Sequence, residues 1–362
     1  MEGQVEREAE RRAGRAAGSG SRRYGSPNAR ALAIAVSGLV LAGTMVVASL
    51  PPSDPGAAED SVDAAGGDLT RRMLLDQVDD APGEIGAVAE PEVCDDGRNP
   101  AESYAPDGID GEAVQRIQDA DQLVVGVDQN SYRWGYREPD TGDIVGFDID
   151  LVRAIGEDLL GPNPDIVFKA IPTAQRIPAI QSGDVDMVVR SMSITCDRWD
   201  DVAFSAAYFE TGQQLLAPVN SGIDGVNESL NGTTVCSGED TTAETELRAR
   251  TQALDVELIT RGNHLDCLVA IQLGQADALM TDSALAAGHA AQDPTVHLVG
   301  EPITVESYGV AMNLEDVDLV RRVNEVLQDY TTGGAWAESY ADWLAAYLPE
   351  GQSTAPEPLY LD

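Results

Sequence analysis

The chain has 362 residues, enough for one large or two ordinary domains, and 43% of them are hydrophobic, so it can bury a core. Its formal net charge is −39, from 62 acidic and 23 basic residues. A chain this acidic is repelled by nucleic acid, which excludes that class of partner, and the same charge keeps a protein soluble.

The N-terminal 50 residues have the pattern of a membrane-targeting segment. The run 31–50 has twenty residues without a charge, which is long enough to cross a bilayer as a helix. Arginines are frequent before this run and acids follow it, so we expect residues 1–30 in the cytoplasm and the bulk outside. The run is either a transmembrane anchor, which we favour because it fills a whole bilayer, or a cleaved signal peptide.

Residues 51–110 are rich in proline, glycine, alanine and acids and show little periodicity, which predicts a linker. Cys94 lies in this region, and a cysteine there makes sense if it staples the linker to the folded part. The tail 349–362 is expected to be disordered.

Strand and helix signals alternate from residue 111 onward. We expect strands at 122–127, 166–171 and 184–189, and helices at 147–159 and 176–182. This β–α–β–α–β order predicts an α/β sheet with buried strands.

The same alternation repeats from residue 213. We expect strands at 233–237, 277–281 and 297–300, and helices at 242–249, 265–273 and 282–292. A strand at 308–312 and helices at 315–330 and 335–348 follow, and Trp336, Tyr340 and Trp343 on the last helix are expected to pack in the core.

Two α/β lobes are therefore expected. Lobe 1 comprises 111–212 and 306–348, lobe 2 comprises 213–305, and ligands of such folds bind beyond strand ends or between lobes.

The segment 188–205, VVRSMSITCDRWDDVAFS, predicts a strand that ends in a polar turn. Hydroxyl and free N–H groups at a strand end, with Arg198 five residues after Ser193, suit a carboxylate. A guanidinium gives such a planar anion two parallel charge-assisted hydrogen bonds. The alternative is a surface arginine in a loop.

Three segments, 146–159 (GFDIDLVRAIGEDL), 175–198 and 202–209, resemble the bacterial solute-binding proteins of the polar amino-acid transport family, family 3. The four cysteines and the C-terminal tail resemble the actinobacterial glutamine/glutamate-binding type. The resemblance implies a two-lobed α/β fold of the periplasmic-binding-protein-like type II. The cleft lies between the lobes, and two hinge crossings, near 208–213 and 304–308, close the lobes around the ligand.

The resemblance also implies which residues hold an amino acid. It assigns Arg198 and Ser193 to the α-carboxylate, and the carbonyl of Ser191 with the side chain of Asp282 to the α-ammonium. A buried cation needs such an anionic partner. The expected ligand-binding set is completed by Thr241 and Thr242 at a helix start in lobe 2, and by Arg176, Arg190, Asp128 and Thr173.

Side-chain specificity rests on Arg176 and Arg190. Arg176, in TAQRIP, resembles the arginine that meets the side-chain carboxylate in binders of acidic amino acids, and Arg190 ends a strand nearby. These arginines near Arg198 predict glutamate or aspartate as the ligand, with asparagine or glutamine next.

Two observations weigh against an acidic ligand, and a third departs from the pattern of the family. Arg176 has an alternative role, which is to pair with Asp184 or Asp186. Glu306 and Asp128, if they lie near the cleft, disfavour a second ligand carboxylate. The aromatic clamp of the family is not obvious, because Ser131 stands at its position and Tyr132 or Trp134 is the available substitute.

The four cysteines allow three pairings by sequence alone, and neither they nor the three histidines have zinc-ligand spacing. With the resemblance, we expect Cys236–Cys267 within lobe 2 and Cys94–Cys196, which pins the linker beside the binding turn. No metal or cofactor is expected.

The sequence therefore predicts an extracytoplasmic, monomeric protein, tethered by its N-terminal helix or secreted, that binds a small amino acid and delivers it to an ATP-binding cassette permease. A membrane sensor protein is the alternative partner. The rival classes are a dehydratase-like enzyme on the same fold, with Asp128 as the candidate acid or base, and an adhesive ectodomain.

Overall fold

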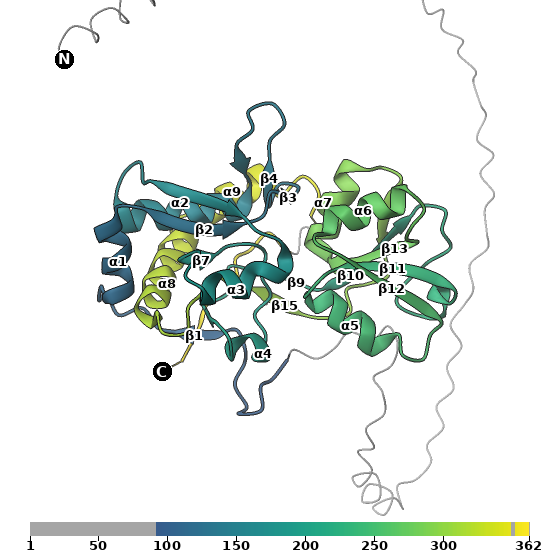
Figure 1. Cartoon of the computed structure of the whole chain (residues 1–362), viewed down its shortest axis with the longest axis horizontal. Helices are drawn as coiled ribbons and strands as arrows, with labels where there is room; N and C mark the ends of the chain where they lie inside the picture. The colour runs from purple at the N-terminus through teal and green to yellow at the C-terminus, as the bar shows by residue number, and fades with distance from the viewer. Residues whose placement is uncertain (1–91, 349–351, 362) are drawn as a thin grey trace, which may run out of the picture. The chain divides into compact units, whose positions relative to one another are not determined.

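The computed structural model describes residues 92–348 and 352–361 (Figure 1). The chain divides into two compact units, 1–76 and 77–362, and all described residues lie in the second. The expected basic segment 1–30, the apolar run 31–50 and the linker up to residue 91 lie outside the described residues. Within the described ranges, no helix is long and apolar enough to cross a membrane.

The first sheet forms the centre of lobe 1 and has the strand order β6-β2-β7-β16-β8. Strand β2 of this sheet has the sequence LVVGV and is almost wholly buried, as the apolar run predicted. β2 pairs in parallel with β6 and β7, whereas β16 runs antiparallel to β7 and β8. The strands are β2 Leu123–Val127, β6 Ile166–Ala170, β7 Met187–Val188, β8 Ala203–Phe204 and β16 Ala311–Met312.

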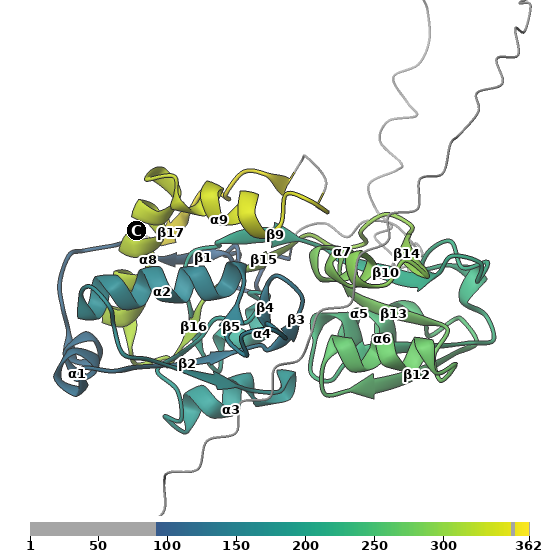
Figure 2. The ribbon, with the colours of Figure 1, turned by 90° about the horizontal axis from the view of Figure 1, so that it is seen from above.

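Helices cover this sheet on both sides, and Figure 2 shows α2 and α3 on opposite sides of β2. α8 packs against α1, α2 and α9, which brings the C-terminal part of the chain back to lobe 1. Trp336 and Tyr340 are buried and stacked, with ring centroids 5.3 Å apart, as expected for core residues. The helices are α1 Glu112–Ala120, α2 Phe147–Leu160, η1 Thr173–Gln175, α3 Arg176–Gln181, α4 Cys196–Trp199, α8 Val317–Thr332 and α9 Ala335–Trp343.

The second sheet, in lobe 2, has the order β12-β11-β13-β10-β14. Successive residues of its strands face opposite cores: Leu215 packs with α5, and Leu216 packs with α6 and α7. The elements are β10 Gln213–Pro218, η2 Glu228–Leu230, β11 Thr233–Gly238, α5 Thr242–Arg250, β12 Val256–Arg261, α6 His264–Gln272, β13 Ala278–Asp282, α7 Ser283–Gln292 and β14 Val296–Val299.

Two antiparallel strands connect the lobes, β9 Phe209–Thr211 and β15 Glu306–Tyr308. They coincide with the two expected hinge crossings. Gly212 follows β9, and a β-carbon at this position would collide with the carbonyl oxygen of Thr304, so only glycine allows the two crossings to approach this closely.

A two-stranded parallel sheet joins β1 Glu102–Tyr104 to β17 Leu359–Leu361. Both strands fall where the sequence predicted a linker and a disordered tail, and the structure differs there. Side-chain hydrogen bonds explain the difference: Ser103 is fully buried and donates to Phe204 O, and Asn324 donates to Ser103 Oγ and Tyr104 O. A hydrophobicity pattern does not contain such contacts.

A short three-stranded sheet follows β2 and projects from lobe 1 (Figure 1). It consists of β3 Asn130–Ser131, β4 Gly135–Arg137 and β5 Ile144–Val145. β3 lies close to α6 and α7 of lobe 2, so this sheet contributes to the contact between the lobes.

Candidate ligand-binding site

Asp148 holds the polar turn after β7 in place through hydrogen bonds. This buried carboxylate accepts hydrogen bonds from the N–H and hydroxyl of Ser191, at 2.9 and 3.0 Å, and from the hydroxyl of Tyr208 at 2.9 Å. Burial raises the pKa of Asp148 to about 7, against the lowering effect of these bonds. Ser191 has a positive φ of 43°, a conformation that non-glycine residues rarely adopt, so Asp148 stabilises an unusual turn.

Arg198 extends from α4 toward the turn and toward lobe 2. Its guanidinium donates to Ser193 O at 2.7 Å and to Asp240 O of lobe 2 at 3.3 Å. Thr195 caps α4 by accepting from Arg198 N. Burial lowers the pKa of Arg198, and nearby carboxylates, Glu306 first, oppose that effect.

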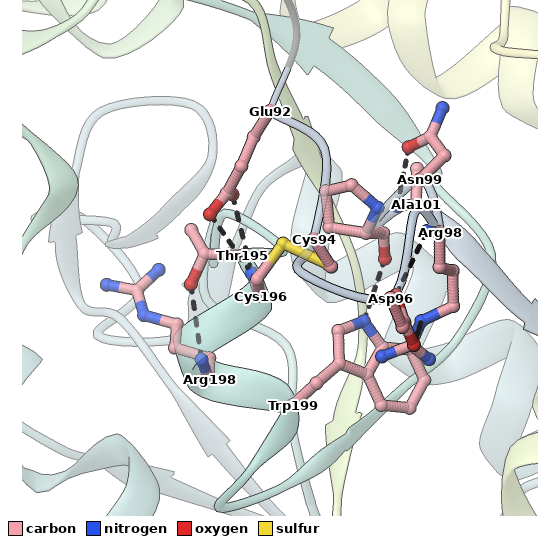
Figure 3. Close-up of a disulfide and its surroundings, with 11 residues drawn as sticks. Glu92, Cys94, Asp96, Arg98, Asn99, Ala101, Thr195, Cys196, Arg198 and Trp199 are labelled. Carbon is pink, nitrogen blue, oxygen red and sulfur yellow. Dashed lines mark hydrogen bonds and ion pairs between the residues drawn. A yellow bond between two sulfur atoms is a disulfide. The ribbon is translucent and has the colours of Figure 1, made fainter. Parts of the chain in front are cut away.

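A disulfide between Cys94 and Cys196 fixes the start of α4, as expected (Figure 3). The segment before β1 makes further contacts there: Glu92 accepts from Cys196 N at 3.4 Å, and Trp199 Nε1 donates to Pro100 O at 2.7 Å. The N-terminal segment therefore holds the helix that presents Arg198. The second expected disulfide, Cys236–Cys267, links β11 to α6.

Arg176 lies at the start of α3 and is 5% exposed. It donates to Thr173 O at 2.9 Å and to Asp240 O at 3.1 Å, so Arg176 and Arg198 reach the same carbonyl oxygen. Among residues 92–348 and 352–361, neither arginine forms an ion pair with a carboxylate.

The alternative that Arg176 pairs with Asp184 or Asp186 is wrong. Asp184 lies beside Lys169, with 3.9 Å between the charged atoms, and Asp186 accepts from Val124 N at 2.8 Å. Burial is the main cause that lowers the pKa of Arg176, followed by the charges of Arg198 and Arg190.

Arg190 is neutralised within lobe 1. Its guanidinium lies 3.1 Å from Asp128 Oδ2, and both side chains are buried. Asp128 also accepts from Ser131 Oγ. Burial raises the pKa of Asp128, but Arg190 and the bond from Ser131 outweigh it, so the net shift is downward. Arg190 and Asp128 therefore form an ion pair with each other, and the charge of Arg190 is already compensated without a ligand.

At the base of the cleft, Glu306 of β15 connects the two lobes. Its Oε2 accepts from Ser193 Oγ of lobe 1 and, at 2.8 Å, from Thr242 Oγ1 of lobe 2. Its Oε1 accepts from Thr304 Oγ1 and from Gln213 Nε2, both at 3.0 Å.

Asp282 lies beside this group at the end of β13, and Gln213 Nε2 also donates to its Oδ1. Burial is the first cause that raises the pKa of Asp282 to about 7, and the charge of Glu306 is the second. A cationic group of a ligand would relieve both effects.

At the start of α5, the hydroxyl groups of Thr241 and Thr242 have different hydrogen-bond partners. The hydroxyl of Thr241 is the helix N-cap, accepting from Glu244 N at 3.2 Å and donating to Gly238 O at 2.8 Å, whereas Thr242 faces Glu306. Thr173 reaches across the cleft and donates from N and Oγ1 to Gly262 O at 3.4 and 3.2 Å.

A cavity of about 570 Å³ adjoins these residues. Its lining includes three expected site residues, Arg198, Thr241 and Thr242. It also includes Glu306 at the base of the cleft and Glu92 from the N-terminal segment. The lobes are therefore in contact across the base of the cleft, with open space at its side.

Comparison with known proteins decides the family. The model of the bacterial extracellular solute-binding proteins, family 3, matches residues 123–346. The chain belongs to this family. Its members are binding proteins, so the dehydratase-like alternative is not supported, and the family name places them outside the cell.

Two relatives show the range of family 3. The ABC transporter glutamine-binding protein GlnH of Bacillus subtilis is 34% identical over 233 residues, which are 64% of this chain and 85% of GlnH. The glutamate-binding protein GluB of Corynebacterium glutamicum is 29% identical over 213 residues, 56% of this chain and 71% of GluB.

Solved structures of two-lobed binding proteins match this fold. An ancestral arginine-binding protein bound to glutamine is 31% identical, with a TM-score of 0.57, and the match covers 61% of this chain and 97% of that protein. A mutant arginine-binding protein of T. maritima is 26% identical, with a TM-score of 0.60, covering 64% and 99%.

Of the two candidates for an aromatic clamp in this family-3 chain, Trp134 is excluded by its burial. Trp134 is fully buried in lobe 1, where its ring meets those of Phe147, Phe209 and Tyr308. Tyr132 packs edge-on against Tyr136, with centroids 5.2 Å apart. Trp134 is therefore a core residue.

Sequence reasoning missed Gln213 and Asp148 as parts of the site. Asp148 belongs to the segment GFDIDL, which resembled the family, but the turn it supports is 43 residues away. Gln213 had no signal of its own, because its role arises from strand pairing opposite Asp282.

Proposed function

We propose that this protein binds an acidic amino acid, glutamate or aspartate, between its lobes and delivers it to a membrane transporter of the ATP-binding cassette class. The observation that carries the proposal is the pair Arg176 and Arg198. Arg176 is buried and Arg198 is half-buried, and within the described residues both bond to main-chain carbonyls without a carboxylate partner. A buried charge without a counter-charge is costly, so an anionic group at each arginine lowers the free energy.

The two arginines suit a short dicarboxylate because they share the carbonyl of Asp240. In the proposed complex, Ser193 gives up its hydrogen bond to Glu306, so that its hydroxyl and Arg198 hold the α-carboxylate, and Arg176 holds the side-chain carboxylate. The ammonium group lies at Asp282, with the carbonyl of Ser191 as a further acceptor.

The main-chain N–H of Thr241, with Thr242 and Thr173, completes the proposed site from both sides of the cleft. Contacts from lobe 1 to Asp240 and Gly262 of lobe 2 form when the lobes are closed. A ligand that bonds to both lobes therefore shifts the population toward the closed form, which the membrane partner recognises.

The names of relatives support an amino-acid ligand. Besides GluB, a relative of Escherichia coli that is 28% identical is a glutamate/aspartate import solute-binding protein. Glutamine is the second candidate, because the two relatives with 34% identity are glutamine-binding proteins and because Glu306 lies close to the site.

We also propose that residues 31–50 anchor the protein outside the membrane and that the chain is monomeric. Detection of residues 1–30 by mass spectrometry in the membrane fraction supports the anchor, and a mature chain that starts after residue 50 contradicts it. Loss of amino-acid uptake on deletion supports transport, whereas normal uptake with a lost transcriptional response supports a sensor.

The proposal is tested by thermal unfolding of the chain with each of the twenty amino acids, followed by calorimetry. A ligand at 100 times its Kd adds about 2.7 kcal/mol to the unfolding free energy and raises Tm. We expect the largest rise with glutamate or aspartate and its loss in Arg198→Met. A rise with glutamine alone would replace the acidic ligand, and no rise with any amino acid would refute the proposal.

A further inference from the structure

Gln213 occupies the point where the carboxylates of the cleft converge. It is the first residue of β10, lies opposite Asp282 in the strand register, and is 1% exposed. Its Nε2 donates to Asp282 Oδ1 at 2.5 Å, to Glu306 Oε1 at 3.0 Å and to Thr242 Oγ1 at 3.0 Å. An amide nitrogen carries two hydrogens, so three acceptors surround two donors.

The other end of the same amide is poorly satisfied. Gln213 Oε1 is buried and has no hydrogen-bond partner within the described residues. A buried acceptor without a donor costs free energy, and this cost offsets part of what the three contacts of Nε2 contribute. Displacement of the amide by a better donor group is correspondingly easier.

An ammonium group matches the acceptors better than the amide does. It carries one positive charge and three N–H donors, one for each of the three oxygen atoms that now surround Nε2. It also neutralises charge between Asp282 and Glu306, which the amide does not, and charge-assisted hydrogen bonds are the stronger kind.

We propose that Gln213 Nε2 occupies the position that the ligand's ammonium group takes on binding, and that Glu306 is the second carboxylate of the ammonium subsite. On binding, the amide withdraws and the ammonium donates to Asp282, Glu306 and Thr242. This proposal rests on the proposed function only in requiring that the ligand is an amino acid. Glu306 thereby contributes, with Asp282, to selectivity for amino acids over the corresponding carboxylic acids.

Glu306 also has a structural role, since it bridges Ser193 of lobe 1 and Thr242 of lobe 2. A test must therefore separate loss of the ammonium subsite from loss of closure. Glu306→Gln keeps the size and an acceptor for the hydroxyl groups but removes the charge. Loss of closure weakens every ligand equally, whereas loss of the subsite weakens those ligands that have an ammonium.

The experiment compares glutamate with glutarate, which has the same two carboxylates and no amino group, by calorimetry on the whole chain. In Glu306→Gln we expect glutamate to bind at least 10-fold more weakly, with glutarate unchanged or tighter. Glu301→Gln is the matched control, because Glu301 is an exposed acid five residues before Glu306 that does not line the cavity, and both ligands should bind as to the unchanged chain.

A second variant tests the placeholder directly. Gln213→Met is expected to bind glutamate as tightly as the unchanged chain or more tightly, because the competing amide is gone. A loss of 10-fold or more would assign Gln213 a direct ligand contact and overturn the placeholder role. Equal weakening of glutamate and glutarate in Glu306→Gln, or no weakening of either, would overturn the role of Glu306.

Failure of the proposed function gives a different result. If the unchanged chain binds glutamine and not glutamate, the acidic specificity is wrong, and the same comparison is made between glutamine and glutaramate, which lacks the amino group. Selective weakening of glutamine by Glu306→Gln then supports the ammonium subsite independently.

Discussion

Replacement of Arg176 by methionine tests the charge argument on which the ligand specificity rests. Methionine keeps the unbranched apolar part of the side chain and removes the guanidinium. Without ligand, the variant loses two hydrogen bonds from a charged group, those to Thr173 O and Asp240 O, worth about 1.5–3 kcal/mol each. It also removes a buried unpaired charge, whose desolvation costs several kcal/mol, so the two effects largely cancel.

The effect of Arg176→Met on ligand binding is not cancelled in this way. Removing one partner of a buried charge pair costs about 2–5 kcal/mol of binding free energy. Taking about 3 kcal/mol for a ligand carboxylate gives a loss of roughly 100-fold in glutamate affinity, since about 1.4 kcal/mol corresponds to tenfold. A neutral amide loses one ordinary hydrogen bond, about 1 kcal/mol, so glutamine affinity falls about fivefold.

Calorimetric titration with both ligands measures this difference, and chemical denaturation checks that the fold is intact. Arg248→Met is a suitable control, because Arg248 is exposed on α5 and pairs with Glu244. Equal losses for glutamate and glutamine would refute the role of Arg176 as the side-chain carboxylate partner. So would a glutamate loss below about fivefold, the value expected for one neutral hydrogen bond.

Three further predictions concern stability and pH. Asp128→Ala should lower the unfolding free energy by about 3–5 kcal/mol, because it leaves Arg190 buried and unpaired. The double variant with Arg190→Met should recover most of this lost stability. Denaturant titration that shows no recovery would contradict the ion pair. Cys94→Ser removes a disulfide that closes a loop of 102 residues, and it should lower the unfolding free energy by up to about 5 kcal/mol in the chain-entropy description. An unchanged denaturation midpoint would show that this disulfide does not stabilise the fold. Asp282 has its pKa raised to about 7 in the folded state, so its contribution to stability is full below the pKa of the unfolded chain and is lost as pH rises through about 7. The ligand-free chain should therefore lose stability relative to Asp282→Asn between about pH 4 and pH 7, and amino-acid affinity should fall as the pH drops below 7; parallel stability profiles would contradict this.

The effect of Asp282 on stability must be measured against Asp282→Asn, because other buried groups destabilise the fold as the pH falls, whereas Asp282 stabilises it. Burial lowers the pKa of His264 to about 3 and that of His289 to about 4. The unfolded chain therefore binds more protons at these histidines as the pH falls below their ordinary value, which destabilises the fold. The difference between the chain and Asp282→Asn isolates the single carboxylate.

Local patterns predicted most of the fold. The apolar run at 122–127 became β2, and the helices at 147–159 and 242–249 correspond to α2 and α5. Each of these features depends on residues within about one or two turns or one strand. The strand signals at β1 and β17 were missed because three-residue strands have too little periodicity, and their pairing joins residues more than 250 positions apart.

The candidate site was predictable where its residues lie in one turn. Ser191, Ser193 and Arg198 share the segment after β7; Ser193 meets Glu306 and Arg198 meets Asp240 at the cleft, whereas Ser191 is bonded to Asp148 within lobe 1. Long-range partners were not predictable: Asp128 meets Arg190 across 62 positions, so Arg190 contributes less free charge than its place in the sequence implied.

The way in which the N-terminal segment is attached also affects how the protein responds to force. Cys94 is bonded covalently to Cys196, and β1 pairs with β17, so both described ends of the unit are fixed on lobe 1. Lobe 2 is inserted between β9 and β15 and contains neither end. Tension applied through the chain before Cys94 therefore passes into lobe 1 and bypasses the hinge strands. The work of opening and closing the cleft is then independent of how hard the protein is pulled at its N-terminal side.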